Sequence, residues 1–306
     1  MKTRTPVSKI SASSKLAMLC KASIVLLALA LFTSAASAQL WLNPLTTVYV
    51  VSLAANGPQF GAVNLADGTF HPIGPTAPVG LSSLVWWNGE LLSLATSAPY
   101  PGYLVRIHPA TGKIIPIGPT GQGFNAFDLV KVNGKLYMTD FQNNIYAVDP
   151  RKGAATLIAA TGMPPDPNIP FTTNADGTLN LCDESLYAVG GKLYATFDSF
   201  NVDLLTAAID ENPVDSTVSP ALYRIDPSTG EATQIGSTDL GVGATVELYG
   251  QFFALESPVN SVAGDFPSGP IELHELDLTT GKSTFIREID PSVGPIFGAA
   301  PILPFL

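Results

Sequence analysis

The chain has 306 residues, of which 46% are hydrophobic and 13% are charged, and acidic residues outnumber basic ones by 25 to 15. The net charge of −10 disfavours nucleic acid and anionic membranes as partners, because both are themselves negatively charged. A chain of this length can bury a hydrophobic core large enough to stabilise a single domain.

Residues 1–38 have the pattern of a secretory signal peptide. Basic residues precede an apolar run at 24–32, and Ala36, Ser37 and Ala38 fit the small-residue cleavage pattern. The apolar run is too short to remain as a membrane anchor. We therefore expect export to the periplasm or the medium, with a mature chain that starts at Gln39.

Removal of the signal peptide would make the chain more acidic. Residues 1–38 hold five basic and no acidic residues, so residues 39–306 have ten basic and 25 acidic residues and a net charge of −15. Cys182 becomes the only cysteine, which excludes an internal disulfide. We expect a monomer that binds neither nucleic acid nor a membrane and whose stability depends on its core.

A repeated strand–turn–strand unit organises the rest of the chain, and residues 222–236 (LYRIDPSTGEATQIG) are its clearest copy. Asp226 and Pro227 favour a tight turn, and Gly230 supplies a position of positive φ, where a Cβ would be strained. Four imperfect copies keep a glycine at the same place in the turn: Gly68, Gly112, Gly153 and Gly281.

A second unit, two apolar runs joined by a tight turn, alternates with the first. Asn88-Gly89, Asn133-Gly134 and Gly190-Gly191 are favoured hairpin turns, because both central residues tolerate positive φ. Tyr249-Gly250 is the weakest of the four turns. Two hairpins per unit give four strands, and their repetition predicts a β-propeller.

The predicted fold is all-β, a propeller of five four-stranded blades formed by residues 39–306. The first repeat lacks an opening strand, and residues 294–303 resemble one. We expect the N- and C-terminal strands to share one blade, which closes the ring and removes its open edges. Six blades is the alternative, because the step from Asp149 to Asp226 is longer than the other steps between repeats.

The long connections are expected on one face of the propeller, which we call the long-loop face. They are residues 161–180, 200–220 and 258–270, whereas the short turns emerge on the other face. Long loops in a compact domain are more often functional than accidental. Residues 202–211 have apolar spacing that suits either a short helix or an irregular loop.

The repeat at 222–236 resembles the units of bacterial secreted propellers related to the quinoprotein-like, NHL and YVTN groups. The resemblance covers most of residues 39–306 and implies the propeller fold. It leaves the activity open, because such repeats serve lactonases, dehydrogenases, carbohydrate enzymes and plain binding modules.

Carboxylates near the predicted innermost strands are the candidate site residues. Asp128, Glu184 and Glu247 fall at the starts or middles of strands that line the central channel. Grouped there, they would suit Ca²⁺, which takes six to eight oxygen ligands, or paired carboxylates for glycoside hydrolysis. Solvated channel charges are the alternative. The histidines at 71, 108 and 274 share no location, so neither a zinc site nor a Ser-His-Asp triad is predicted.

These observations predict a secreted, non-catalytic binding or structural propeller. It would engage a small molecule, a glycan or a protein on the long-loop face, with no cofactor unless Ca²⁺ binds at Asp128, Glu184 and Glu247. The alternative is a hydrolase of the lactonase or glycosidase type that uses the carboxylates at the channel mouth. A quinoprotein dehydrogenase is a third interpretation, for which no cluster of tryptophans and cations is present.

Overall fold

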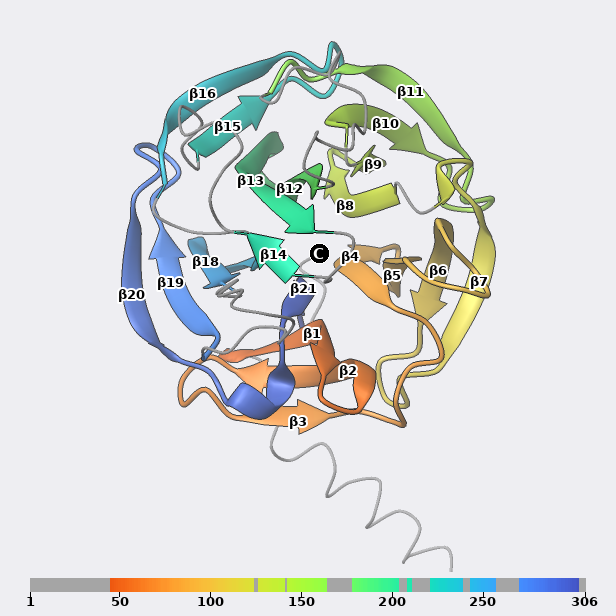
Figure 1. Cartoon of the computed structure of the whole chain (residues 1–306), viewed down its shortest axis with the longest axis vertical. Coiled ribbons are helices and arrows are strands. Elements are labelled where there is room, and N and C mark those ends of the chain that lie inside the picture. The colour runs from red at the N-terminus through yellow and green to blue at the C-terminus, as the bar shows by residue number, and fades with distance from the viewer. Residues whose placement is uncertain are drawn as a thin grey trace, which may run out of the picture. The chain divides into compact units, whose positions relative to one another are not determined.

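The computed structural model describes residues 45–123, 126–140, 142–163, 178–203, 208–210, 221–238, 243–256 and 270–302; the side chains at 178–184, 197–203, 208–210 and 256 are outside this description. All of these residues belong to one compact unit, Pro44–Leu306. The predicted signal peptide at 1–38 lies outside the described residues. Within them, the chain forms five antiparallel sheets arranged radially around a central axis (Figure 1).

The five sheets are the predicted blades. Blade 1 holds β21 (Ile296–Pro301), β1 (Thr47–Ala54), β2 (Gly57–Asn64) and β3 (Phe70–Pro72); blade 2 holds β4 (Leu81–Trp87), β5 (Glu90–Ala95), β6 (Tyr103–Ile107) and β7 (Ile114–Pro119); blade 3 holds β8 (Ala126–Val132), β9 (Lys135–Asp140), β10 (Asn144–Val148) and β11 (Ala155–Ala160). Blade 4 holds β12 (Thr178–Val189), β13 (Lys192–Asp203), β15 (Ala221–Ile225) and β16 (Ala232–Ser237), with β14 (Ala208–Asp210) added to β13; blade 5 holds β17 (Gly243–Leu248), β18 (Gln251–Glu256), β19 (Glu272–Leu276) and β20 (Ser283–Glu288).

The prediction of five blades closed by the two chain ends is confirmed. β21 pairs with β1, with Pro301 opposite Val48 and Ala299 opposite Val50. The alternative of six blades is wrong. The long step between Asp149 and Asp226 is partly taken up by β12 and β13, which are 12 residues each, and by the added strand β14.

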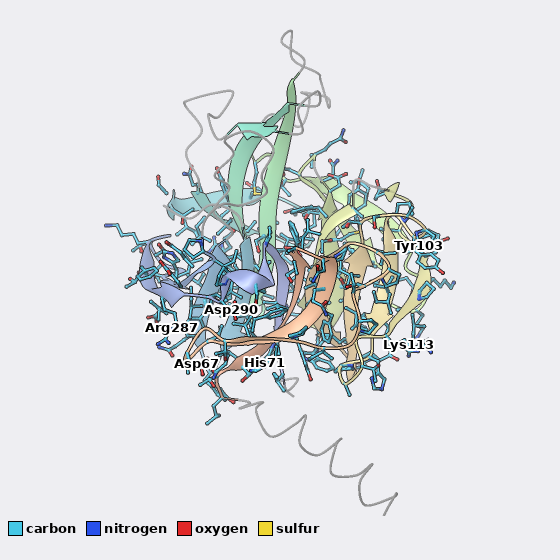
Figure 2. All side chains as sticks on the ribbon, turned by 60° about the horizontal axis from the view of Figure 1, so that its bottom comes forward. Asp67, His71, Tyr103, Lys113, Arg287 and Asp290 are labelled. Carbon is cyan, nitrogen blue, oxygen red and sulfur yellow. The ribbon has the colours of Figure 1, made fainter. Side chains whose placement is uncertain are left out.

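The interpretation of residues 202–211 as a short helix is wrong for the residues that the structure describes. Val202 and Asp203 end β13, and Ala208–Asp210 form β14, which pairs with β13. Figure 2 shows the β12–β13 hairpin, in green, extending beyond one face of the ring. A hydrogen-bonded ladder in this hairpin satisfies the backbone groups better than a single helical turn would.

The repeated turn glycines have the conformation that the sequence predicts, and they also mark close contacts between blades. Gly153 has φ +80°, and a Cβ there would overlap the Gly118 carbonyl of the preceding blade, 2.6 Å from its carbon. The same kind of contact joins every pair of adjacent blades, at Gly74 with Thr111, Gly118 with Gly153, Ala159 with Gly230, Gly236 with Thr280, and Glu288 with Gly68. The turn glycine of the repeat therefore serves packing between blades as well as the turn.

Asp226 anchors its turn as the repeat predicts. Its carboxylate accepts hydrogen bonds from the Ser228 amide at 2.8 Å and the Ser228 hydroxyl at 2.6 Å. We expect Asp226→Ala to lower the melting temperature by about 2–4 °C, because one local hydrogen-bonded turn is lost in a domain of this size. Calorimetry checks this, with Glu231→Ala in the same turn as the control. Equal melting temperatures for the two variants would contradict the anchoring role.

The hydrophobic core lies between neighbouring blades. In one cluster Leu92 and Leu94 of blade 2 pack with Leu129 and Met138 of blade 3, all of them buried. Similar clusters join blades 3 and 4, blades 4 and 5, and blades 5 and 1. Among the described residues, no helix is long and apolar enough to cross a membrane.

Candidate functional site

A cavity of about 270 Å³ lies in the central channel. The first strands of the five blades surround it, and they contact one another in the order β21, β4, β8, β12, β17 and back to β21. Each strand contributes side chains to the lining, among them Trp86, Asp128, Ser185, Glu247 and Phe297. The inner strands β4, β8, β12 and β17 each run from a blade-to-blade connection into a hairpin, and β21 also follows such a connection. The five strands therefore share one direction along the channel.

Three neighbouring inner strands carry a β-bulge in the half that begins at the blade-to-blade connection. The register shifts between Ser82 and Val85 in β4, between Ala126 and Leu129 in β8, and around Phe297 in β21. A bulge bends the strand and redirects a side chain, and bulges are frequent beside functional sites. The irregular backbone is therefore concentrated at the long-loop end of the channel.

Ser83 is the point of backbone strain at this end. It has φ +57° within β4, a conformation that costs a non-glycine residue of order 1–3 kcal/mol unless its surroundings fix it. Gly298 of β21 fixes it from one side, because a Cβ at Gly298 would lie 2.7 Å from the Ser83 nitrogen and overlap its Cα. The Ser83 hydroxyl has two acceptors for its one proton, the Ser82 carbonyl at 2.6 Å and the Asp128 carboxyl.

Asp128 is a buried carboxyl in the wall of the cavity. Only 8% of the residue is exposed, and its two oxygens accept hydrogen bonds from the Leu129 amide at 2.7 Å and the Leu186 amide at 2.5 Å. Desolvation disfavours its charged form and raises the pKa of the Asp128 carboxyl to about 7, although the two amides and Ser83 lower it. Asp128 thus joins blades 2, 3 and 4 and changes protonation near neutral pH.

The other polar residues of the cavity lie at different heights along the channel. Ser185 and Thr245 are 3.4 Å apart, hydroxyl to hydroxyl, across the boundary of blades 4 and 5. Lys131 and Glu247 also line the cavity, and each lies close to the hairpin that ends its strand. They are therefore near the short-turn end, whereas Asp128 is near the long-loop end.

The predicted ligand set of Asp128, Glu184 and Glu247 is only partly described. Asp128 and Glu247 line the same cavity but lie toward its opposite ends, and the side chain of Glu184 is outside the described residues. Among the side chains that the structure describes, no three His, Cys, Asp or Glu residues gather in a way that could hold a metal ion. The metal site stays a prediction.

The histidines lie away from the cavity, on strands or turns of different blades. His274 of β19 is buried, with its Nε2 3.0 Å from a Glu272 oxygen and its Nδ1 3.3 Å from the Ser283 hydroxyl. This cluster lies on the two outer strands of blade 5, and none of its three residues lines the central cavity.

Ser83 and Phe297 are site residues that the sequence did not reveal. One signal in the sequence could have identified them. Inner strands are expected to be mostly apolar, but β4 contains Ser82 and Ser83 and β21 contains Gly298. A bulge shifts the alternation of side chains by one position. The face of β8 to which Asp128 points therefore depends on the bulge, which the alternation of apolar and polar residues does not reveal.

The chain belongs structurally to the class of five-bladed β-propellers. A scan against protein-family models found no match, and a search of curated proteins found none. Among solved structures it is similar to a crystal structure from Bacteroides fragilis NCTC 9343, described as a candidate 6-phosphogluconolactonase, with a TM-score of 0.39 and 14% identity. The alignment covers 83% of this chain and 97% of that chain. A likeness at this level says nothing about activity.

Proposed function

We propose that the protein is a non-catalytic binding propeller that holds a small molecule in its central channel. The observation that carries this proposal is the cavity of about 270 Å³ with the buried Asp128 carboxyl in its wall. Burial of this carboxyl costs stability when it is charged, and a carboxyl in a cavity wall whose pKa is raised to about 7 is typical of a functional site. The volume lies just below the usual range for drug-sized ligands, so the ligand is small.

The long-loop face is the proposed entrance. Asp128, Ser83 and the three bulges lie at this end of the channel, and the β12–β13 hairpin extends beyond the ring where β13 no longer pairs with β15 after Phe197. Binding sites on propellers and similar scaffolds are commonly built from loops carried by a rigid frame. We also propose that the protein is related to the secreted quinoprotein-like, NHL and YVTN propellers that its repeat resembles. After the export that residues 1–38 predict, it would act as a monomer.

A melting-temperature screen tests the proposed binding site. The probes are simple sugars, lactones, amines and carboxylates, each in large excess over the mature protein, residues 39–306. A ligand at one hundred times its Kd stabilises the folded state by about 2.7 kcal/mol, which shifts the melting temperature by several degrees. We expect at least one class to produce such a shift in the wild type.

Two tryptophan variants locate the bound molecule. Thr245→Trp places an indole in the cavity, and Thr284→Trp places one on the exposed outer strand β20. The ligand shift should disappear in the first variant and persist in the second. A panel with no active member, or a shift that survives Thr245→Trp unchanged, would count against the channel as the binding site.

A hydrolase is the second candidate function, because a carboxyl with a pKa near 7 suits general acid–base catalysis at neutral pH. Under this reading Asp128 transfers the proton. Assays with lactones and glycosides, with and without EDTA, test it. Turnover that Asp128→Asn abolishes would establish the hydrolase, and binding without turnover would leave the non-catalytic proposal.

A further inference from the structure

We infer that the channel ligand is a small organic cation, an amine or quaternary ammonium with an apolar body, whose charged group lies against Asp128 and Phe297. This inference rests on the proposed binding site and names the chemistry of its ligand. It is carried by the lining of the cavity, the free capacity of the Asp128 carboxylate, and the charge of the segments around that end of the channel.

The lining provides one buried ionisable group at the long-loop end, Asp128, and its charged form is negative. Among the described side chains of the cavity, the only other charged ones are Lys131 and Glu247, which lie near the hairpin end of their strands. Apolar residues, Leu84, Val130 and Ala299 among them, line the wall between these polar groups. A ligand that fits this wall has an apolar body and a group that can pair with a carboxylate.

Asp128 retains acceptor capacity for one small cationic group. Its oxygens accept the Leu129 and Leu186 amides and the Ser83 hydroxyl, and a carboxylate has about four acceptor positions in all, so one remains. A pairing cation offsets the desolvation that burial imposes on the carboxylate. Ca²⁺ would need six to eight oxygens, whereas an ammonium group needs few acceptors and tolerates apolar walls.

Phe297 provides an aromatic surface in the same cavity as the Asp128 carboxyl. It lies in the bulge of β21, next to Gly298, which packs on Ser83, and Ser83 in turn contacts Asp128. Phe297 lines the cavity and is 37% exposed, so its ring is open to a ligand. Cations bind favourably to aromatic faces, and quaternary ammonium groups do so without needing a hydrogen bond.

The charge of the surrounding chain favours the same ligand. The described strand ends that extend beyond the ring on the long-loop side, residues 178–184 of β12, 197–203 of β13 and 208–210 of β14, contain five acidic residues and no lysine or arginine. A concentration of one sign of charge around a channel mouth raises the local concentration of oppositely charged ligands and speeds their entry. The acidic stretches alone define no site; the site is the cavity with Asp128 in its wall.

The test compares a cation with its neutral isostere. Choline and 3,3-dimethyl-1-butanol have nearly the same shape and differ in one charge, so calorimetric titration of the mature protein with each isolates the charge. We expect choline, or butylamine as the primary-amine probe, to bind at least tenfold more tightly than the neutral alcohol. The preference should shrink as salt is raised, because the acidic mouth is screened.

Matched variants assign the contacts. Asp128→Asn should abolish the preference for the cation, and Glu247→Gln should preserve it. Phe297→Leu should weaken cation binding about three- to tenfold, whereas Phe285→Leu on the exposed face of β20 should not change it. If Asp128→Asn does not fold, the comparison of choline with its neutral isostere and the two phenylalanine variants still test whether the ligand is a cation bound at Phe297.

The possible outcomes separate the two proposals. If sugars or lactones bind in the channel and both amines do not, the inference of a cationic ligand is wrong and the proposed binding site still holds. Equal affinity for choline and its neutral isostere would lead to the same conclusion. Binding of Ca²⁺ without either amine would also overturn the inference of a cationic ligand. If no probe of any class binds, the proposed function fails first.

Discussion

Replacing Gly153 with alanine is expected to destabilise the propeller by about 3 kcal/mol or more. Two costs add. A left-handed backbone conformation costs a residue with a Cβ about 1–2 kcal/mol, and Gly153 has φ +80°. Forcing an extra methyl into a packed contact costs about 1–3 kcal/mol, and here the methyl would meet the Gly118 backbone, which cannot rotate away. Urea unfolding measures the loss.

Gly134→Ala is the matched control, because it changes the conformation without the contact. Gly134 also has positive φ, +73°, but a Cβ there would meet no atom within 4 Å. We expect it to cost only the conformational part, about 1–2 kcal/mol. Equal losses for the two variants would show that the contact between blades 2 and 3 contributes nothing and that the glycine serves the turn alone.

The stability of the wild type is expected to contain a contribution from Asp128 that falls as the pH rises from about 4 to about 7. The pKa of Asp128 is raised from 3.8 to about 7 in the folded state, so in this window the folded protein binds more protons than the unfolded chain. Stability then decreases with pH. At 1.36 kcal/mol per pKa unit, the full change is at most about 4 kcal/mol.

Asp128→Asn isolates this contribution. Asp67, Asp226 and Asp277 have lowered pKa values because hydrogen bonds stabilise their charged forms, and their stabilisation is lost at low pH, in the opposite sense. They are present in both proteins, so the difference between wild type and variant reports Asp128. Unfolding free energies at pH 5 and pH 8.5 should differ more in the wild type, and parallel profiles would contradict the raised pKa.

Much of the fold could be predicted because the repeat encodes it locally. Asp226, Pro227 and Gly230 define a turn by their own chemistry, and the glycine at the equivalent place in the other four copies fixes the spacing of the blades. The shared blade could also be predicted, because the first unit lacks one strand and the last unit is followed by an additional strand. Pairing the two completes the blade and closes the ring. The turns depend on residues that are close together in the sequence, whereas the shared blade followed from the number of strands in the first and last units.

The features that could not be predicted depend on contacts between distant segments. Residues 202–211 have apolar spacing that suits a helix, yet the described part pairs with β13 because a long partner strand is available there. The bulges that place Asp128 and Ser83 at the cavity arise where five inner strands meet, and no single strand contains that information. Asp128 was identified as a candidate, but its neighbours Ser83 and Phe297 were not.

The pairing of β21 with β1 has a consequence for how the protein acquires its structure. The paired residues Val48 and Pro301 are about 250 positions apart in the sequence, and β21 follows every other described strand of the ring. Contacts of such high sequence separation slow folding, because the entropy of closing the loop is lost before the contact stabilises anything. Until β21 docks, β1 presents an open edge that can pair with another molecule, so the unclosed ring is the species most exposed to aggregation.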